Sequence, residues 1–139
     1  MVTEITNCTK SSLNTLLIKR AVEVTLKFGR VKGDISVVII GDAAMTKLNK
    51  QFRKINKPTD ILSFAEKDSD FKDKNFIGEL FIDLAQIKRQ AKKLQNKLAW
   101  ELSFITIHGT LHLLGYEDET KQGQKKMEEL GYKLIKKII

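Results

Sequence analysis

The chain of 139 residues contains one cysteine, one proline and two histidines. The single cysteine, Cys8, cannot form a disulfide within the chain, which favours a reducing compartment. No stretch approaches the roughly 18 apolar residues that a membrane helix requires, and the N-terminal stretch MVTEITNCTK lacks the basic and then apolar pattern of a signal peptide. We therefore expect a cytoplasmic protein without a membrane partner.

Internal repeats, low-complexity tracts and linkers rich in proline, glycine or serine are also missing from the sequence. Hydrophobic residues make up 42% of the chain and charged residues 30%, which is typical of a folded globular protein. A chain of this length has room for a single buried core. We expect one domain that covers residues 1–139.

Positive charge is in excess: 25 lysines and arginines stand against 17 aspartates and glutamates, which gives a formal net charge of +8. Such a field favours polyanionic partners, namely RNA, DNA or anionic lipid. The alternative is that the surface lysines serve only solubility. A membrane surface is disfavoured because Glu128 and Glu129 interrupt the basic residues of the last predicted helix.

Alternating or β-branched apolar patterns predict four strands, at residues 2–7, 34–41, 60–65 and 76–83. Apolar residues at helical spacing predict five helices, at residues 11–29, 43–54, 83–96, 98–115 and from 120 onward. A polar loop is predicted at residues 68–75. Helices and strands are partly interleaved, so the sequence predicts an α+β fold with a small mixed four-stranded sheet.

Local signals set the expected helix ends. We expect a serine to cap the first helix and Gly29 to end it, and Asp42 to cap the second helix. Asp83 and Gln86 form a capping-box-like pair at the start of the third helix. The fourth helix, LAWELSFITIHGTLHLLG, is almost entirely apolar, so we expect it to be the central buried helix, with Gly115 as its stop.

Both histidines of the chain lie in the stretch HGTLHLLGYED, residues 108–118. On a helix, His108 and His112 lie on one face, one turn apart, so they can share one metal ion. Asp118 follows the glycine stop and can fold back toward the same face. Two imidazoles and one carboxylate match a catalytic zinc site, which uses three protein ligands and leaves one position open.

A purely structural interpretation of this stretch is also open. Two histidines at this spacing can be core or partly exposed side chains, and Asp118 can serve as an N-terminal charge for the last helix. The cost of burying a histidine without a partner favours the metal site. The metalloprotease pattern H-E-x-x-H is absent, because Gly109 occupies the position of its general-base glutamate.

Three blocks of the sequence resemble the YbeY family of bacterial metal-dependent endoribonucleases and rRNA maturation factors. HGTLHLLGYED is similar to the family signature H-G-x-L-H-L-x-G-Y-D-H. LNKQFRKINKPTDILSF resembles the block L-N-x-x-F-R-x-x-x-x-P-T-D-V-L-S-F, and IGEL stands where the family has L-G-D-I. The blocks occur in the family's order, and the resemblance spans the chain from about Ile35 to Met127.

The resemblance implies a zincin-like α+β fold and one zinc ion per chain, held by three histidines of which His108 and His112 are the first two. The third family histidine falls on Asp118, and Glu117, at the family's aspartate position, is an alternative third ligand. A carboxylate ligand lowers the charge of the metal site by one and shifts its preference toward harder ions such as Mn²⁺. No nucleotide cofactor is expected.

The resemblance also implies a role for Arg53, which matches a family arginine near the metal. A guanidinium is a planar, permanently charged partner for phosphate, although an arginine at a helix end can instead bond the last carbonyls. Glu79, which replaces a family aspartate, is a candidate for carboxylate assistance. Ser63 and Thr59 are candidates for substrate contacts or for strand-edge structure, whereas Trp100 and the phenylalanines are expected in the core.

The main hypothesis is an endoribonuclease that uses a metal to hydrolyse phosphodiester bonds of single-stranded RNA, in small-subunit rRNA maturation and ribosome quality control. The alternative is a non-catalytic assembly factor with a structural metal, which binds pre-rRNA or small-subunit ribosomal proteins. The missing third histidine and the missing general base favour this alternative. A metal-dependent hydrolase of a small molecule is a third class.

Overall fold

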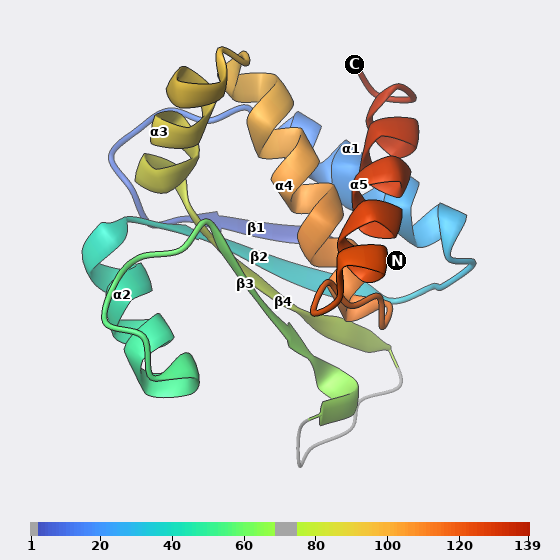
Figure 1. Ribbon diagram of the computed structural model, residues 1–139, viewed down its shortest axis with the longest axis horizontal. Helices are drawn as coiled ribbons and strands as arrows, with labels where there is room; N and C mark the ends of the chain where they lie inside the picture. Colours follow the sequence, from blue (N-terminus) through green and yellow to red (C-terminus); the bar gives the residue numbers. More distant parts are fainter. Residues whose placement is uncertain (1–2, 69–74) are drawn as a thin grey trace.

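The computed structural model describes residues 3–68 and 75–139, and Figure 1 shows its layered arrangement. The elements follow the chain in this order: β1 (Thr3–Asn7), α1 (Thr15–Phe28), β2 (Asp34–Ile40), α2 (Asp42–Arg53), β3 (Ile61–Ala65), the 3-10 helix η1 (Glu66–Asp68), β4 (Phe76–Asp83), α3 (Leu84–Leu94), α4 (Leu98–Leu113) and α5 (Lys121–Ile135). The described residues thus contain the four strands and five α-helices that the sequence predicts. The predicted polar loop at residues 68–75 lies mostly outside the described residues.

The four strands form one mixed sheet in the order β1-β2-β4-β3. β2 pairs in parallel with both β1 and β4, whereas β3 pairs antiparallel with β4 and lies at an edge of the sheet. The expected α+β architecture with a small mixed sheet is therefore confirmed. The strand order itself could not be predicted from local patterns, because it depends on pairings between distant segments.

The two faces of the sheet are covered unequally. α1, α3, α4 and α5 lie on one face, which we call the inner face, and α2 lies on the opposite, outer face (Figure 1). Alternate strand residues point to opposite faces, so Val37 and Leu80 join the inner core while Leu62 packs with Met45 of α2 on the outer face. Among the described residues, no helix is long and apolar enough to cross a membrane.

α4 is the central helix, as the sequence predicts. Most of its residues are buried, and it packs against α1, α3, α5 and β3. Its buried hydroxyl groups do not compete with this packing, because Ser103, Thr106 and Thr110 each donate to the carbonyl four residues earlier, at 2.7 to 2.8 Å. These polar side chains are satisfied inside their own helix, so the whole of α4 can lie in the core.

Three helix ends follow the predicted signals. Asp83 caps α3, and its Oδ1 accepts hydrogen bonds from the backbone N–H groups of Ala85 and Gln86 at 3.0 and 3.3 Å. The Gln86 side chain turns toward its own helix instead of completing a capping box. Gly29 follows α1, and Gly115 follows α4 with a φ of 101°, in the left-handed region that favours glycine.

Two predicted caps are wrong. α1 starts at Thr15 and its N-cap is Asn14 rather than a serine. The N-cap of α2 is Gly41, and Asp42 is the first residue inside the helix. The Asp42 carboxylate is turned toward α3, where it accepts two hydrogen bonds from Arg89, at 2.8 and 2.9 Å. The local signal assigns the Asp42 side chain to a helix cap, but the side chain forms a long-range ion pair instead.

Asp42 and Asp83 also form a carboxyl pair at the starts of α2 and α3. Asp83 is fully buried, and this burial, together with its hydrogen bond to Asp42, raises the pKa of Asp83 to about 7. The hydrogen bond from Arg89 lowers the pKa of Asp42 to about 2. Asp83 is therefore protonated in mildly acidic solution, whereas Asp42 is ionised.

Candidate metal centre

His108 and His112 project from one face of α4, with ring centroids 4.7 Å apart. The residue between them that matters most for packing is Gly109, because a Cβ atom at this position would collide with the side chain of Ile61 in β3. The hydroxyl of Ser63 donates to the Gly109 carbonyl at 3.1 Å and ties the helix to the strand. The glycine that excludes a metalloprotease base is thus the residue that lets α4 lie close to β3.

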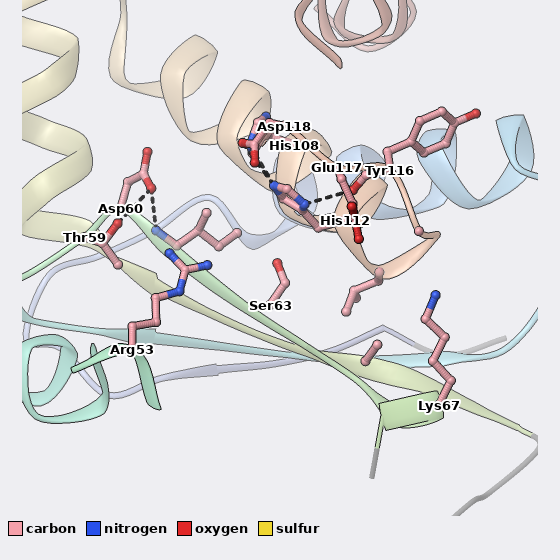
Figure 2. A pocket seen from close by; sticks show the side chains of 14 residues that line it. Arg53, Thr59, Asp60, Ser63, Lys67, His108, His112, Tyr116, Glu117 and Asp118 are labelled. Atoms are coloured by element: carbon pink, nitrogen blue, oxygen red, sulfur yellow. Dashed lines mark hydrogen bonds and ion pairs between the residues drawn. The ribbon is translucent and has the colours of Figure 1, made fainter. Parts of the chain in front are cut away.

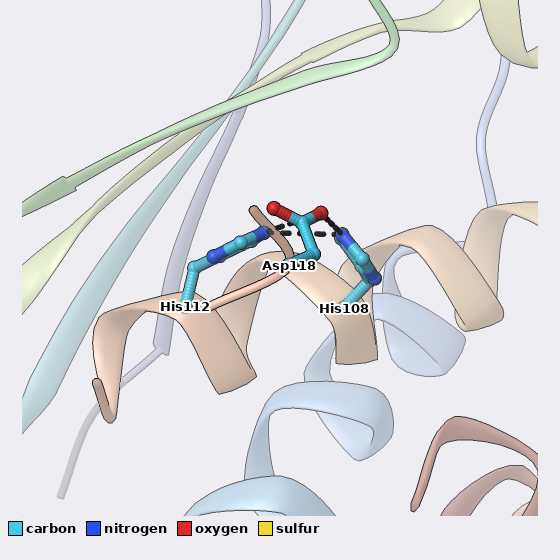
Figure 3. A group of neighbouring side chains, drawn as sticks. All are labelled: His108, His112 and Asp118. Carbon is cyan, nitrogen blue, oxygen red and sulfur yellow. Dashed lines mark hydrogen bonds and ion pairs between the residues drawn. The ribbon is translucent and has the colours of Figure 1, made fainter. Parts of the chain in front are cut away.

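The connection from α4 to α5 returns the chain to the histidines. After Gly115, the carbonyl of Tyr116 lies 3.0 Å from Nδ1 of His112. Thr120 then caps α5 through a bond from the Gly123 N–H group at 2.9 Å. Between these two anchors, the Asp118 carboxylate reaches the two imidazoles, as Figure 3 shows.

Three ligand atoms converge in this arrangement. Nε2 of His108 lies 3.1 Å from Nε2 of His112 and 3.2 Å from Oδ2 of Asp118, and the third separation, from His112 Nε2 to Asp118 Oδ2, is 3.4 Å. Zinc bonds of roughly 2.0–2.1 Å in a tetrahedron require ligand atoms about 3.3 Å apart. The cluster therefore fits a small divalent ion with its three ligands already in place.

The protonation of the imidazoles also suits metal binding. A carbonyl oxygen only accepts hydrogen bonds, so the Tyr116 contact assigns the proton of His112 to Nδ1 and leaves the Nε2 lone pair facing the cluster. Burial, together with the nearby His112, lowers the pKa of His108, although Asp118 and Asp60 oppose this shift. His108 is therefore neutral at pH 7, as a ligand must be.

The cluster forms one wall of a pocket of about 550 Å³. Its polar lining residues come from α2, β3, η1, α4 and the two connections beside them: Arg53, Thr59, Asp60, Ser63, Lys67, His108, His112, Tyr116, Glu117 and Asp118 (Figure 2). Two cations and three carboxylates line the pocket, which leaves one net negative charge. A divalent ion would reverse this to one net positive charge, which suits an anionic substrate.

Arg53, the last residue of α2, extends its guanidinium into this pocket toward the space below the histidines (Figure 2). Lys54, in the left-handed conformation with a φ of 62°, ends the helix and its N–H group bonds the Lys50 carbonyl. Within the described part of the chain, no hydrogen bond or ion pair engages the Arg53 side chain. Arg53 is therefore not a capping residue, and its charge is available to a ligand.

Thr59 and Ser63 both line the pocket, and both hydroxyl groups are also bonded to the protein. Ser63 bonds the carbonyl of α4 described above, and Thr59 lies 3.5 Å from Oδ1 of Asp60. Asp60 additionally accepts from the N–H group of Ile61 and from Gln90. Asp60 thus orders the start of β3, while the Thr59 and Ser63 oxygens keep lone pairs that face the pocket.

Glu79 does not lie in the pocket, and the expectation of carboxylate assistance from this residue is corrected. Its neighbour Leu80 is fully buried in the inner core, so Glu79 points to the outer face. There it accepts a hydrogen bond from Ser36 of β2 at 3.3 Å. Glu117 lines the pocket but does not join the three-residue cluster, so the geometry selects Asp118 as the partner of the histidines.

Sequence reasoning missed two residues of the site. Lys67, in η1, lines the pocket at the end of β3 opposite Arg53 (Figure 2). No pattern marks it, because its position depends on the turn after the strand. Tyr116 contributes its backbone carbonyl to His112. The tyrosine is part of the quoted G-Y-D signature, yet a backbone contact leaves no trace in the residue type.

Comparison with known proteins identifies the family. Residues 3–139 match the family model described as Endoribonuclease YbeY. The chain belongs to the YbeY family. It is therefore an enzyme of the class that hydrolyses RNA, and the resemblance inferred from the three sequence blocks is confirmed.

YbeY relatives align over most of their length. The chain is 30% identical to Endoribonuclease YbeY of Brevibacillus brevis, over 88% of this chain and 85% of the relative. It is 34% identical to Endoribonuclease YbeY of Acholeplasma laidlawii, over 83% and 82% of the two chains. The solution structure of TM1509 from Thermotoga maritima covers 96% of this chain and 89% of its own, with a TM-score of 0.62 and 25% identity.

Proposed function

We propose that this chain is a metal-dependent endoribonuclease that cleaves single-stranded regions of rRNA precursors in small-subunit maturation and ribosome quality control. It would act in the cytoplasm as one domain over residues 1–139, with small-subunit ribosomal proteins as candidate partners. The observation that carries the proposal is the convergence of His108, His112 and Asp118 in a pocket that also holds the guanidinium of Arg53, which has no partner among the described residues. A metal site beside an unpaired cation is suited to an RNA phosphodiester.

The metal that we propose is zinc, one ion per chain, held by His108, His112 and Asp118. Mn²⁺ is the second candidate, because a carboxylate ligand suits a harder ion better than a third imidazole does. When bound, such an ion supplies Lewis-acid chemistry: it polarises a phosphoryl oxygen and lowers the pKa of water. Tyr116 supports this role by holding His112 in the tautomer that a ligand requires.

The other lining residues would position the RNA. Arg53 would bind and neutralise the scissile phosphate with two parallel N–H donors. The oxygens of Thr59 and Ser63 would accept hydrogen bonds from the ribose, since their own protons are directed to protein acceptors. Ser63 would also keep α4 and β3 in register, so its loss should disturb both the metal and the substrate.

The test is cleavage of matched single-stranded and duplex RNA by the metal-loaded protein. We expect cleavage of the single strand, and its loss in His112→Ala together with the metal. Arg53→Ala should lose turnover but keep the metal content of the unmodified chain. A protein that binds no divalent metal at neutral pH, or His112→Ala protein with undiminished cleavage, would contradict the proposal.

A non-catalytic assembly factor is the second candidate. It is favoured by Asp118 in place of the third family histidine and by the outward orientation of Glu79, which removes a candidate base from the pocket. Genetic complementation separates the two functions in cells that lack the endogenous protein. If His112→Ala and Arg53→Ala chains restore rRNA processing as well as the unmodified chain does, the assembly role is correct and the catalytic role is wrong.

A further inference from the structure

The C-terminal end of α2 and the loop after it expose apolar side chains beside the pocket. Phe52 is 55% exposed and Ile55 is 40% exposed, although the sequence leads us to expect the phenylalanines in the core. We name the segment that carries Phe52, Arg53, Ile55 and Lys57, at the end of α2 and in the loop after it, the α2 platform. Phe52 is exposed because α2 covers only part of the outer face, and the helix ends one residue later.

The ring of Phe52 is held in place by the sheet. It meets Phe64 of β3 edge to face, with centroids 4.9 Å apart and planes inclined by 62°. Phe64 meets Phe81 of β4 in the same way, at 5.8 Å and 80°. An exposed ring that is held by a second ring can meet a ligand at little cost in side-chain entropy.

The loop beside Phe52 is also fixed in place. The buried side chain of Asn49 donates from Nδ2 to the carbonyl of Lys57 at 2.8 Å, and the N–H group of Ile55 bonds the carbonyl of Asn49. Residues 55–57 therefore fold back on α2 rather than extend into solvent. The platform is a preformed surface, which favours binding because less freedom is lost on contact.

The charge of this surface is of one sign. Residues 43–57 contain five basic residues and no acidic residue, and all five basic side chains are exposed: Lys47, Lys50, Arg53, Lys54 and Lys57. Among the described residues, the other exposed aromatic side chain is that of Tyr132 in α5, which is 47% exposed but has Glu128 and Glu129 in the same helix. Lysines are depleted at protein–protein interface cores, whereas aromatic rings among cations are typical of surfaces that bind single-stranded nucleic acid.

We propose that the α2 platform binds the single-stranded RNA that flanks the cleavage site, with one unpaired base stacked on Phe52 and an adjacent phosphate paired with Lys57. The inference rests on the proposed function, because it takes RNA as the substrate. Arg53 connects the two regions: it belongs to the platform by sequence and to the pocket by position. A strand that follows these cations would pass from the metal cluster over the open edge of β3 to the outer face.

The platform has a direct consequence for substrate choice. A base can stack on Phe52 only if it is not already stacked in a duplex, so the platform would select single-stranded RNA independently of the metal. The proposal therefore names a source of specificity that lies outside the pocket.

The experiment measures binding of a fluorescent single-stranded RNA and of a matched duplex by anisotropy, in the presence of a chelator so that no cleavage occurs. Phe52→Leu should weaken single-strand binding about tenfold, within the usual range for one base stacked on an aromatic ring, and should leave duplex binding unchanged. Phe52→Trp should retain the single-strand affinity. Tyr132→Leu is the matched control, because Tyr132 is an exposed aromatic residue outside the platform. This variant should bind both RNAs as the unmodified chain does.

The salt dependence gives a second measurement on the same samples. Lys57→Gln should reduce the slope of log affinity against log salt by about 0.7, the value for one phosphate contact on a single strand. Phe52→Leu should leave this slope unchanged, because stacking releases no counterions.

Two outcomes would overturn the proposal. One is unchanged single-strand binding by Phe52→Leu. If this variant binds RNA normally but fails in cells, the surface binds a protein rather than RNA, and the proposal is wrong. The other is equal loss of single-strand and duplex binding. Neither outcome depends on the metal. If the chain cleaves RNA through His112 but shows either outcome, only the platform proposal is wrong and the proposed function stands. If the chain has no nuclease activity, it can still bind RNA through Phe52.

Discussion

The two parts of the chain that supply the metal cluster differ in how firmly they are held. His108 and His112 lie on α4, whose neighbouring residues Ile107 and Leu111 are fully buried against α1 and α5. Asp118 lies on the connection to α5, with 39% of its side chain exposed. The helix is fixed by the core, whereas the connection is fixed by a few hydrogen bonds at its ends.

This difference accounts for the position of the two departures from the family pattern that lie beside the cluster. The histidines, which are part of the core helix, match the family pattern, and both changes near the cluster, Glu117 and Asp118, fall on the connection. A side chain on a surface connection can be exchanged without repacking a core. In the proposed metal site, the helix would therefore set the position of the ion, and the connection would set the chemistry of the third ligand.

The largest effect on the site is expected from His112→Ala, which removes one of the two proposed metal ligands on α4. Loss of an outer-shell partner alone costs about 10–100-fold in metal affinity, so loss of a ligand should cost at least as much, and RNA cleavage should disappear with the metal. Metal content per chain and cleavage rate are measured on the same preparation. Circular dichroism shows whether His112→Ala still folds. If the signal is lost, His112→Asn is used in place of His112→Ala.

The next effect in size is expected from Gly109→Ala, which should push α4, with both histidines, away from β3. The new Cβ atom would collide with Ile61, and overpacking of this kind typically costs about 1–3 kcal/mol of unfolding free energy. Metal affinity should fall as well, because His108 moves with α4. Urea unfolding and metal titration provide the two measurements.

A compensating change makes this prediction specific. Ile61→Val removes the Cδ1 atom that the new methyl group would meet, so the double variant should recover most of the stability and metal affinity. If Ile61→Val gives no recovery, the close approach of α4 to β3 is not the reason for the glycine.

A smaller effect is expected from changes in the connection. Asp118→Ala should weaken metal binding about tenfold, at the lower end of the range for groups around a metal, because the two histidines still hold the ion. Asp118→His should tighten zinc binding relative to Mn²⁺, since imidazole suits the softer ion. Glu117→Gln is the matched control and should leave both affinities unchanged; an equal loss in this variant would mean that Glu117 completes the site.

Asp83→Asn should have the smallest effect on the site and serves as a reference for pH. The folded chain holds the Asp83 proton more tightly than the unfolded chain, because its pKa rises from 3.8 to about 7. This contribution to stability is complete below the unfolded pKa and is lost as pH rises through about 7. Relative to the variant, which keeps the capping oxygen but cannot ionise, the unmodified chain should therefore lose stability between about pH 4 and pH 7. The lowered pKa of His108 changes stability in the opposite direction, but it acts on both chains alike.

Chemical denaturation at several pH values measures this difference, and metal titration at the same values should give matching affinities for the two chains. Asp42 does not interfere in this range, because its lowered pKa affects stability only below its ordinary value of 3.8. A variant with the same pH dependence as the unmodified chain would show that another group is responsible.

The features that could be predicted from the sequence are those that depend on neighbours in the chain. Helical periodicity places His108 and His112 on one face, Asp83 caps its own helix, and Gly115 takes the backbone conformation that ends α4. Each of these results follows from a few consecutive residues, so the pattern contains the information.

The features that could not be predicted depend on distant partners. Asp42 has a cap-like position but bonds Arg89, which is 47 residues away. Glu79 belongs to one of the three blocks that resemble the family, yet its side chain lies on the face that α4 does not cover. Phe52 is apolar and exposed because, of the helices that the structure describes, α2 alone lies on the outer face (Figure 1). In each case the tertiary packing decides, and local patterns do not record it.

The edge position of β3 has a consequence for solubility. An edge strand presents unpaired backbone N–H and C=O groups, which can recruit a strand from another molecule and start aggregation. Here that edge borders the pocket, so a helix cannot cover it without blocking the site. Its length of five residues and the cations at its two ends, Arg53 and Lys67, are the usual protections of such an edge. The charges that would draw in an RNA strand would thus also keep a second copy of the protein away.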